Sequence, residues 1–205
     1  DLNNKKSLDS FKNIDYLIHC ASITDAEKSF VRKKEMFKNN LNCLKTVMNF
    51  CNSNKVKLIH ISSTSVYGPQ SNLVDENCNV KELKPQTPYA DIKLKEEKLI
   101  EKELYRKNSY IILRLGTIYG FSPGIRFHTA INKFCLQACM NQPLTVWKTA
   151  YNQKRPYLGI HDFNRAIEHI ILENVFHNSI YNVLSHNKKV KEIIDIINQK
   201  TATKI

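Results

Sequence analysis

The chain has 205 residues, 42% of them hydrophobic. This is enough to bury the core of one domain or slightly more, so we do not expect a disordered chain. Its formal net charge of +12 raises the question of nucleic-acid binding, but the lysines are spread over helical patterns and mixed with acids, as in residues 93–98. We therefore expect solvated helix faces and no nucleic-acid partner. A small anionic ligand fits the charge equally well. No apolar run approaches the roughly 18 residues of a membrane span, so no membrane partner is expected.

The six cysteines form no CxxC pair and have no histidine at zinc-finger spacing, so we expect no metal site. Cys135 and Cys139 are four residues apart on a predicted helix, and we expect them to be packed thiols. This use of cysteine indicates a reducing compartment, and the polar first residues do not resemble a signal peptide. The expected location is the cytoplasm.

In the first half of the chain, β-rich runs alternate with helical patterns. Residues 14–19 and 57–61 are predicted strands, and between them apolar residues recur at intervals of three and four over residues 30–52, which predicts a helix. A second helix is expected over residues 88–107 and a third strand over 110–115. Such alternation predicts an α/β fold with a parallel sheet whose strands are buried on both faces.

Polar residues follow each predicted strand, at residues 19–22, 62–68 and 116–120. In a parallel sheet these turns open onto one crevice, where ligands bind. Residues 68–87 have little periodicity and are expected to form a long functional loop. The second half is expected to contain helices over residues 127–141, 163–173 and 189–200, and short strands over 143–147, 157–160 and 181–183.

The strongest chemical signal is Tyr89 followed four residues later by Lys93, with Ser63 at the end of a predicted strand. Residues i and i+4 share one face of a helix, so the phenol and the ammonium would point into the same crevice. A free phenol titrates near pH 10, and a neighbouring cation favours phenolate. Ser63 could then hydrogen-bond both the phenol and a substrate hydroxyl. Each signal alone is weak, because an exposed helix with a surface lysine gives the same spacing.

The order of motifs resembles the extended short-chain dehydrogenase/reductases, in particular the NAD-dependent epimerase/dehydratases that act on nucleotide sugars. The segment SSTSVYG at residues 62–68 is similar to the family's SS-x-x-VYG, and PYADIK at 88–93 matches PYxxxK. Further matches are IHCAS at 18–22, NLNCL at 40–44, LRL at 113–115 and RPY at 155–157. The resemblance covers nearly the whole chain.

The resemblance implies hydride transfer with NAD, and NADP is not excluded. Tyr89 would take the proton from a sugar hydroxyl, Lys93 would lower the Tyr89 pKa and bind the nicotinamide ribose, and Ser63 would orient the hydroxyl. Besides Tyr89 and Lys93, the positions that match cofactor contacts of the family are Asp1, Leu2, Ala21, Ser22, Asn40 and Leu115.

The resemblance also implies a nucleotide-diphosphate sugar as the partner, with Arg155 on the diphosphate and Arg126 as a second candidate that could equally be an ordinary surface arginine. Thr64 and Thr117 are the other substrate-binding positions. The family often forms homodimers through a four-helix bundle, here made by the helices over residues 30–52 and 88–107. Residues 114–157 also look like family members associated with bacterial surface polysaccharides.

Three departures from the family pattern bear on function. No glycine-rich turn is present among only five glycines, so we expect the chain to be N-terminally incomplete and the isolated fragment to bind NAD poorly and to be inactive. Thr64 and Ser65 stand where family dehydratases carry Asp-Glu, which disfavours dehydration. Thr117 replaces an asparagine found in several epimerases.

The expected architecture is a Rossmann-type doubly wound parallel sheet without its first strands and glycine-rich loop, followed by part of a smaller C-terminal substrate-binding lobe. Residues 1–120 would form the partial NAD-binding domain, and residues 121–205 the partial substrate-binding region interleaved with returning Rossmann elements. The expected function is epimerisation or oxidoreduction of a nucleotide sugar. A net NAD(P)-dependent sugar reductase and a non-catalytic nucleotide-binding protein of the same fold are the alternatives.

Overall fold

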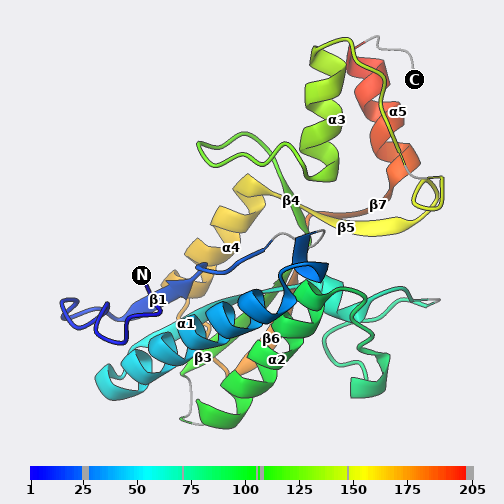
Figure 1. Ribbon diagram of the computed structural model, residues 1–205. Coiled ribbons are helices and arrows are strands. Elements are labelled where there is room, and N and C mark those ends of the chain that lie inside the picture. The colour runs from blue at the N-terminus through cyan, green and yellow to red at the C-terminus, as the bar shows by residue number, and fades with distance from the viewer. Residues whose placement is uncertain (25–27, 71, 105, 107–108, 147, 202–205) are drawn as a thin grey trace. The chain divides into compact units, whose positions relative to one another are not determined.

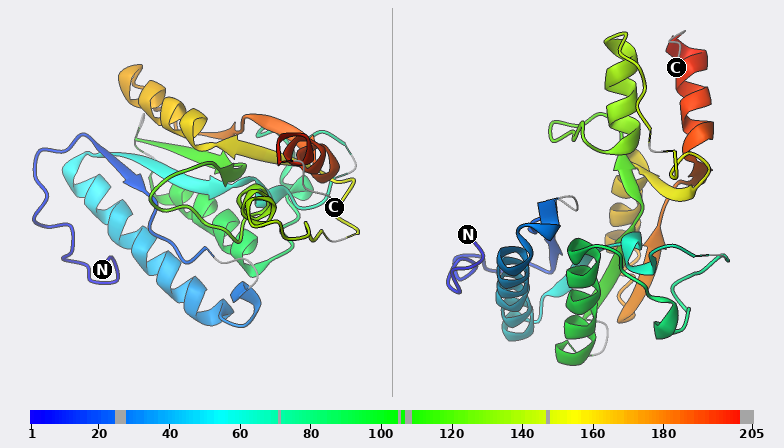
Figure 2. Two further views of the ribbon diagram at one scale, coloured as in Figure 1. Left: turned by 90° about the horizontal axis from the view of Figure 1, so that it is seen from above. Right: turned by 45° about the vertical axis from the view of Figure 1, so that its right-hand side comes forward.

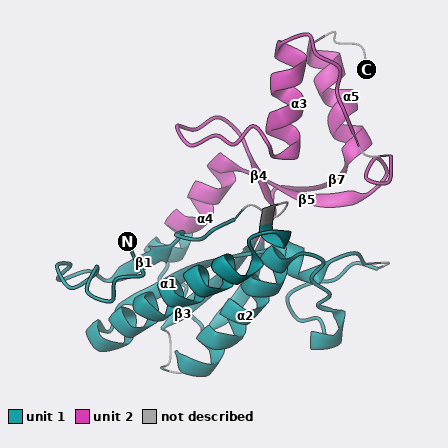
Figure 3. Cartoon of the chain, viewed as in Figure 1, with its two compact units in different colours: residues 1–114, 169–182 teal, residues 115–168, 183–205 magenta. Residues whose placement is uncertain are grey.

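A computed structural model of the chain describes residues 1–24, 28–70, 72–104, 106, 109–146 and 148–201. The chain divides into two compact units (Figure 3). Unit 1 contains residues 1–114 and 169–182, and unit 2 contains residues 115–168 and 183–205. The two units are therefore described one after the other.

Unit 1 is built on a four-stranded sheet with the order β1-β2-β3-β6 (Figure 1). The strands are β1 (Tyr16–His19), β2 (Lys57–Ser63), β3 (Tyr110–Leu115) and β6 (Ser179–Val183). β1 and β2 run parallel, with Tyr16 opposite Lys57 and His19 opposite His60. All six residues of β3 are buried, as the continuous apolar run predicts. The predicted parallel α/β architecture is confirmed.

Two helices of unit 1, α1 (Lys33–Asn54) and α2 (Pro88–Glu103), lie side by side and in contact (Figure 2). α1 ends where Lys55 adopts a left-handed conformation, with its N–H bonded to the Cys51 carbonyl. α2 begins at Thr87, whose Oγ1 accepts a hydrogen bond of 3.1 Å from the Ala90 N–H. Pro88 occupies the first helical position, where its missing N–H costs nothing. The last residues of the predicted helix, 105 and 107, lie outside the described residues.

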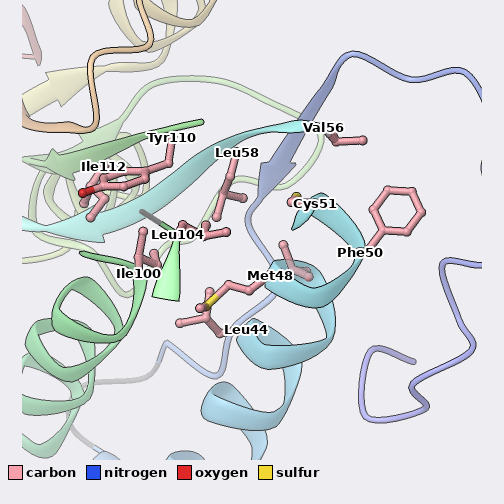
Figure 4. Close-up of a cluster of buried hydrophobic side chains, with 11 residues drawn as sticks. Leu44, Met48, Phe50, Cys51, Val56, Leu58, Ile100, Leu104, Tyr110 and Ile112 are labelled. Carbon is pink, nitrogen blue, oxygen red and sulfur yellow. The ribbon is translucent and has the colours of Figure 1, made fainter. Parts of the chain in front are cut away.

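The main core of unit 1 lies between these helices and the sheet (Figure 4). Apolar side chains from both helices meet those of the central strands. The buried members are Leu44, Val47, Met48, Phe50, Cys51, Val56, Leu58, Ile100, Leu104, Tyr110 and Ile112. Because the core fixes α2 against β2, it also fixes the residues that these two elements carry at their ends.

The loop predicted over residues 68–87 begins after a short 3-10 helix, η2 (Thr64–Tyr67), and contains another, η3 (Val80–Glu82). Gly68 has a φ of 63°, and a Cβ built there would lie 1.9 Å from the Lys84 carbonyl oxygen. Only glycine allows the loop to return so closely to η2. A third 3-10 helix, η1 (Lys28–Phe30), precedes α1.

Unit 2 contains a three-stranded sheet with the order β4-β5-β7, formed by β4 (Thr117–Tyr119), β5 (Lys154–Gly159) and β7 (His186–Lys189). β4 and β5 are parallel, whereas β5 and β7 are antiparallel. Helices α3 (Ala130–Cys139) and α5 (Val190–Thr201) share a second apolar core. Helix α4 (Ile160–Leu172) follows β5 directly, and the boundary between the units falls within it, after Glu168.

Several predictions for unit 2 were wrong. Residues 143–146 form no strand, and Trp147, the last residue of that predicted strand, lies outside the described residues. β4 and β7 were missed because each has only three or four residues, with no clear alternation of apolar and polar side chains. Cys135 and Cys139 are exposed rather than packed.

Candidate active site

Ser63 is the last residue of β2 and the N-cap of η2. Its Oγ accepts a hydrogen bond from the backbone N–H of Ser65 at 3.2 Å and another from the Ser65 hydroxyl at 2.9 Å. A serine oxygen has two acceptor lone pairs and one hydrogen to donate. Because Ser65 occupies both lone pairs, Ser63 is left as a donor.

Tyr89 and Lys93 lie one turn apart at the beginning of α2, where Tyr89 is half-buried and Lys93 is buried. The Lys93 ammonium donates to the Ile61 carbonyl oxygen at 3.0 Å and to Glu96 Oε2 at 2.8 Å. Ile61 lies two residues before Ser63 on β2. The structure therefore brings the Lys93 side chain onto the strand that ends at Ser63.

Sequence reasoning missed a buried group around this lysine, which we call the Lys93 cluster: His19, His60, Lys93 and Glu96. Glu96 Oε2 lies 3.2 Å from His60 Nε2, and His60 Nδ1 lies 3.2 Å from His19 Nδ1. All four residues are at most 3% exposed. Two signals pointed to it: Glu96 is three residues after Lys93 on the same helix, and both histidines lie in β-rich runs that pair in the sheet.

The pKa values in the Lys93 cluster follow from burial and from the lysine charge. Burial, with a further contribution from His60, lowers the pKa of His19 to about 3, and burial also lowers the pKa of His60. Burial alone would raise the pKa of Glu96, but the Lys93 ammonium and His60 outweigh it and lower that pKa to about 2. At neutral pH the cluster therefore contains two neutral histidines and one ion pair.

A second buried network lies beside the first, and we call it the Arg114 clamp: Ser62, Tyr67, Glu97 and Arg114. Arg114 donates from Nε and Nη2 to the two Glu97 oxygens at 3.0 and 2.7 Å, and from Nη1 to the Tyr67 hydroxyl at 2.9 Å. Ser62 donates to Glu97 Oε1 at 2.5 Å. The fork-to-carboxylate geometry ties β3, α2 and the end of β2 together.

Besides Tyr89 and Lys93, the residues of unit 1 expected to contact a cofactor occupy two places. Ser22 follows β1 and meets Asn40 of α1, whose amide nitrogen donates to Ser22 Oγ at 2.8 Å and whose oxygen accepts from the Ile23 N–H at 2.9 Å. Asn40 thereby fixes the turn after β1, where Ala21 is exposed.

The other place is the N-terminal segment. Leu2 packs against the main core, and Asp1 Oδ1 accepts from the Asn3 N–H at 2.9 Å. This holds the Asp1 side chain close to its own backbone.

The remaining candidates, except Thr64, belong to unit 2. Leu115 is the buried last residue of β3 and the first residue of unit 2, and Thr117 begins β4. Arg155 is exposed on β5 and donates to Gln153 Oε1 at 2.8 Å. Arg126 is exposed, and its carbonyl accepts from the Thr129 hydroxyl at 2.9 Å. Thr64 is the first residue of η2 in unit 1.

Within the described residues, no group of three or more His, Cys, Asp or Glu side chains is arranged to hold a metal ion. The same part of the chain contains no helix long and apolar enough to cross a membrane.

Curated proteins with similar sequences include some whose names refer to nucleotide sugars. The chain is 30% identical over 202 residues to a dTDP-D-glucose 4,6-dehydratase of Dictyostelium discoideum, covering 90% of this chain and 45% of that protein. It is 27% identical over 165 residues to an uncharacterized UDP-glucose epimerase of Bacillus subtilis, covering 78% and 50%. The chain thus spans about half the length of these relatives.

Solved structures share the fold. A dTDP-glucose 4,6-dehydratase of Streptomyces venezuelae with NAD bound matches with a TM-score of 0.85 at 19% identity, over 100% of this chain and 63% of that one. A mutant UDP-glucuronic acid 4-epimerase of Bacillus cereus, in complex with a fluorinated UDP-sugar and NAD, matches with a TM-score of 0.86 at 24% identity, over 98% and 64%. The model of the NAD dependent epimerase/dehydratase family matches residues 1–183. The chain belongs to the NAD-dependent epimerase/dehydratase family.

Proposed function

We propose that this chain contributes the catalytic centre of an NAD-dependent enzyme that epimerises, or otherwise oxidises and reduces, a carbon of a nucleotide sugar. The observation that carries the proposal is the position of Lys93. Its ammonium is bonded to β2 two residues before Ser63, and Tyr89 lies one helical turn away. Together these residues supply a cation, a phenol and a hydroxyl donor near the carboxyl end of a parallel strand, where ligands of such sheets bind.

The residues of unit 1 fit a dinucleotide in two respects. Of its three ammonium hydrogens, Lys93 uses two for Ile61 and Glu96, which leaves one for a ribose hydroxyl. The turn after β1 exposes Ala21 and is fixed by Asn40, so its backbone is open to a ligand. NAD would supply the acceptor and donor of the hydride. Leu2 and Asp1 are proposed as contacts of its adenine, and Leu115 as a further contact.

Tyr89 and Ser63 are the residues that we propose for the proton chemistry. Tyr89 would take the proton of the sugar hydroxyl as the carbon is oxidised and return it when the carbon is reduced. Ser63 would donate its hydrogen to the sugar oxygen, because both of its lone pairs are occupied by Ser65. A donor at this position favours the carbonyl form of the sugar carbon.

The substrate contacts proposed in addition are Thr64, Thr117, Arg126 and Arg155. The guanidinium of Arg155 is exposed on β5 and suits the diphosphate of a nucleotide sugar, since its planar fork matches phosphate oxygens. The threonines offer hydroxyls to the sugar.

A dehydratase is the second candidate, because the Dictyostelium relative has that name. Elimination of water needs an acid and a base beside the tyrosine. Here the two residues after Ser63 are Thr64 and Ser65, and Ser65 is hydrogen-bonded to Ser63. Neither hydroxyl titrates near neutral pH, so epimerisation is favoured.

The product identifies the reaction. The protein at its full natural length is incubated with UDP-glucose or dTDP-glucose and NAD, and the sugar is analysed by NMR. An epimerised sugar with no net NADH supports the proposal. A 4-keto-6-deoxy sugar identifies a dehydratase, and stoichiometric turnover of the nicotinamide identifies a net reductase. No reaction with any nucleotide sugar supports a non-catalytic nucleotide-binding protein.

We also propose that the enzyme is a cytoplasmic homodimer whose α1 and α2 form a four-helix bundle with their counterparts. The side-by-side packing of these helices supports the dimer, and six free thiols suit a reducing compartment. Light scattering that gives the mass of a monomer would rule out the dimer. A role in surface-polysaccharide synthesis stays a proposal.

A further inference from the structure

The lysine of the proposed active site is paired with a carboxylate that has no part in the proposed proton transfer. Glu96 Oε2 accepts from the Lys93 ammonium at 2.8 Å, and both side chains are almost completely buried. A buried ammonium is costly unless it is paired and hydrogen-bonded. The carboxylate therefore compensates the buried ammonium and fixes the direction of the Lys93 side chain.

Glu96 is the partner of Lys93 because the neighbouring carboxylate is already engaged. Glu97 is the next residue of α2, but its two oxygens accept from Arg114 and Ser62. The two acidic residues are equally buried and serve different cations. This division provides a matched control within one helix.

His60 lies against Glu96 on its other side, and His19 lies against His60. His60 Nε2 lies 3.2 Å from the same Glu96 oxygen, and the ring of His19 approaches His60 with 5.3 Å between ring centroids. Among the described residues, Glu96 Oε1, His60 Nε2 and His19 Nε2 are buried without a hydrogen bond of good geometry, so the contact between His60 and Glu96 is close but not a well-formed hydrogen bond. Since the buried cluster holds one cation and one carboxylate, it is neutral as a whole.

We propose that Glu96 is a positioning residue for Lys93, which pairs with the buried ammonium and directs it toward the end of β2, and that His60 and His19 pack behind Glu96. The inference rests on the proposed function, since it concerns the lysine of the proposed active site. Glu96 touches neither substrate nor cofactor in this account and acts only through Lys93. Lys93 then keeps one ammonium hydrogen for a ligand.

The test measures how fast acetic anhydride labels Lys93, which requires the neutral amine and can be quantified by peptide mass spectrometry in any folded protein. Titratable groups that face the Lys93–Glu96 pair are His19 and Cys20 from β1 and the turn after it, His60 from β2 and Cys43 from α1, and Glu97 of α2 acts on His60. Labelling is followed from pH 7 to 10. Exposed Lys95 on the same helix serves as the internal reference.

In the wild-type chain we expect Lys93 to label at least ~10-fold more slowly than Lys95, because the amine is buried and paired. Glu96→Gln keeps a hydrogen-bond acceptor but removes the charge, and we expect labelling of Lys93 at pH 8 to rise ~10-fold, the effect of losing an opposite charge at this distance. Glu96→Asp should restore slow labelling at least in part.

The control variant Glu97→Gln distinguishes a positioning effect of Glu96 on Lys93 from a general loss of folding stability. It disrupts the Arg114 clamp and loosens the fold, yet it leaves Lys93 paired with Glu96, so labelling of Lys93 should stay at the wild-type rate. Equal rises in both variants would show that only local opening changed and would overturn the proposal. A wild-type Lys93 that labels as fast as Lys95 would overturn it without any variant.

The full-length enzyme gives a second readout. We expect Glu96→Gln to shift the pH profile of kcat/KM, whereas Glu97→Gln should leave its position unchanged. If the wild-type enzyme converts no nucleotide sugar, the proposed function fails, and the labelling experiment still decides the role of Glu96. If the wild type is active and Glu96→Gln changes neither labelling nor the profile, the positioning role alone fails.

Discussion

Replacing Glu97 by Gln tests whether the Arg114 clamp stabilises the fold. The substitution keeps the shape of the side chain but removes the charge that two guanidinium nitrogens contact at 3.0 and 2.7 Å. Glu97 and Arg114 are 1% and 3% exposed, so the remaining guanidinium would be a buried charge without its carboxylate. Breaking such a pair from one side costs about 3–5 kcal/mol. Because the free energy of unfolding of a domain is only roughly 5–15 kcal/mol in total, this loss should be readily measurable.

The assay is urea unfolding followed by far-UV circular dichroism. Hydrogen exchange of peptides from α2 and β3 shows whether the loss of stability is located in unit 1. The control is Glu35→Gln, which removes the carboxylate of a 2.5 Å ion pair with Arg32 that is half exposed to solvent. Solvent screening makes that pair weak, so no measurable change is expected. Replacing Glu97 and Arg114 together by Leu and Met should recover much of the loss, since no unpaired charge remains.

A loss below about 1 kcal/mol for Glu97→Gln, a typical value for exposed pairs, would refute the reasoning. So would a double variant that is less stable than the single one by the full cost of the second substitution. Either result would mean that water or another group compensates for Arg114.

Two further predictions follow from the structure, one on pH and one on a loop glycine. Burial lowers the pKa of His19 to about 3 and also lowers the pKa of His60. Below about pH 6.5 the unfolded chain therefore binds more protons than the folded chain, so the free energy of unfolding should be level above that pH and fall as the pH drops toward 3. Equal urea midpoints at pH 7.5 and 5 would contradict this. Gly68→Ala should cost about 1–3 kcal/mol, because it strains a residue with positive φ and places Cβ against the Lys84 carbonyl. Gly124→Ala, with no atom within 4 Å, should leave thermal stability unchanged, and similar melting temperatures for both variants would argue against this account of the loop.

The sequence predicted the parts of the fold that have long periodic patterns. The helices near residues 30–52 and 88–107 and the three β-rich runs of unit 1 were found because apolar periodicity reports burial directly. In unit 2, β4 and β7 are too short to show a period, and residues 143–146 have β-forming side chains without a strand partner. Strand pairing depends on tertiary contacts that local patterns do not contain.

The sequence predicted which residues form the candidate site but not which groups surround them. The spacing of Tyr89 and Lys93 predicted a shared helix face, and the structure places Lys93 against β2. The sequence did not reveal that Glu96 and Glu97, adjacent and alike, bind different cations. That difference depends on which side of α2 faces β1 and β2 and which faces β3. Such a choice is fixed only when the helix packs on the sheet.

The central claim, that Tyr89 moves the proton in a redox step on a nucleotide sugar, is tested most directly by turnover of the full-length protein with Tyr89→Phe. The matched control is Tyr16→Phe, which removes the same hydroxyl from a ring stacked on Phe176 at the other end of β1. The account predicts a fall in kcat of at least ~100-fold for Tyr89→Phe and wild-type turnover for the control. Unchanged turnover of Tyr89→Phe would contradict it.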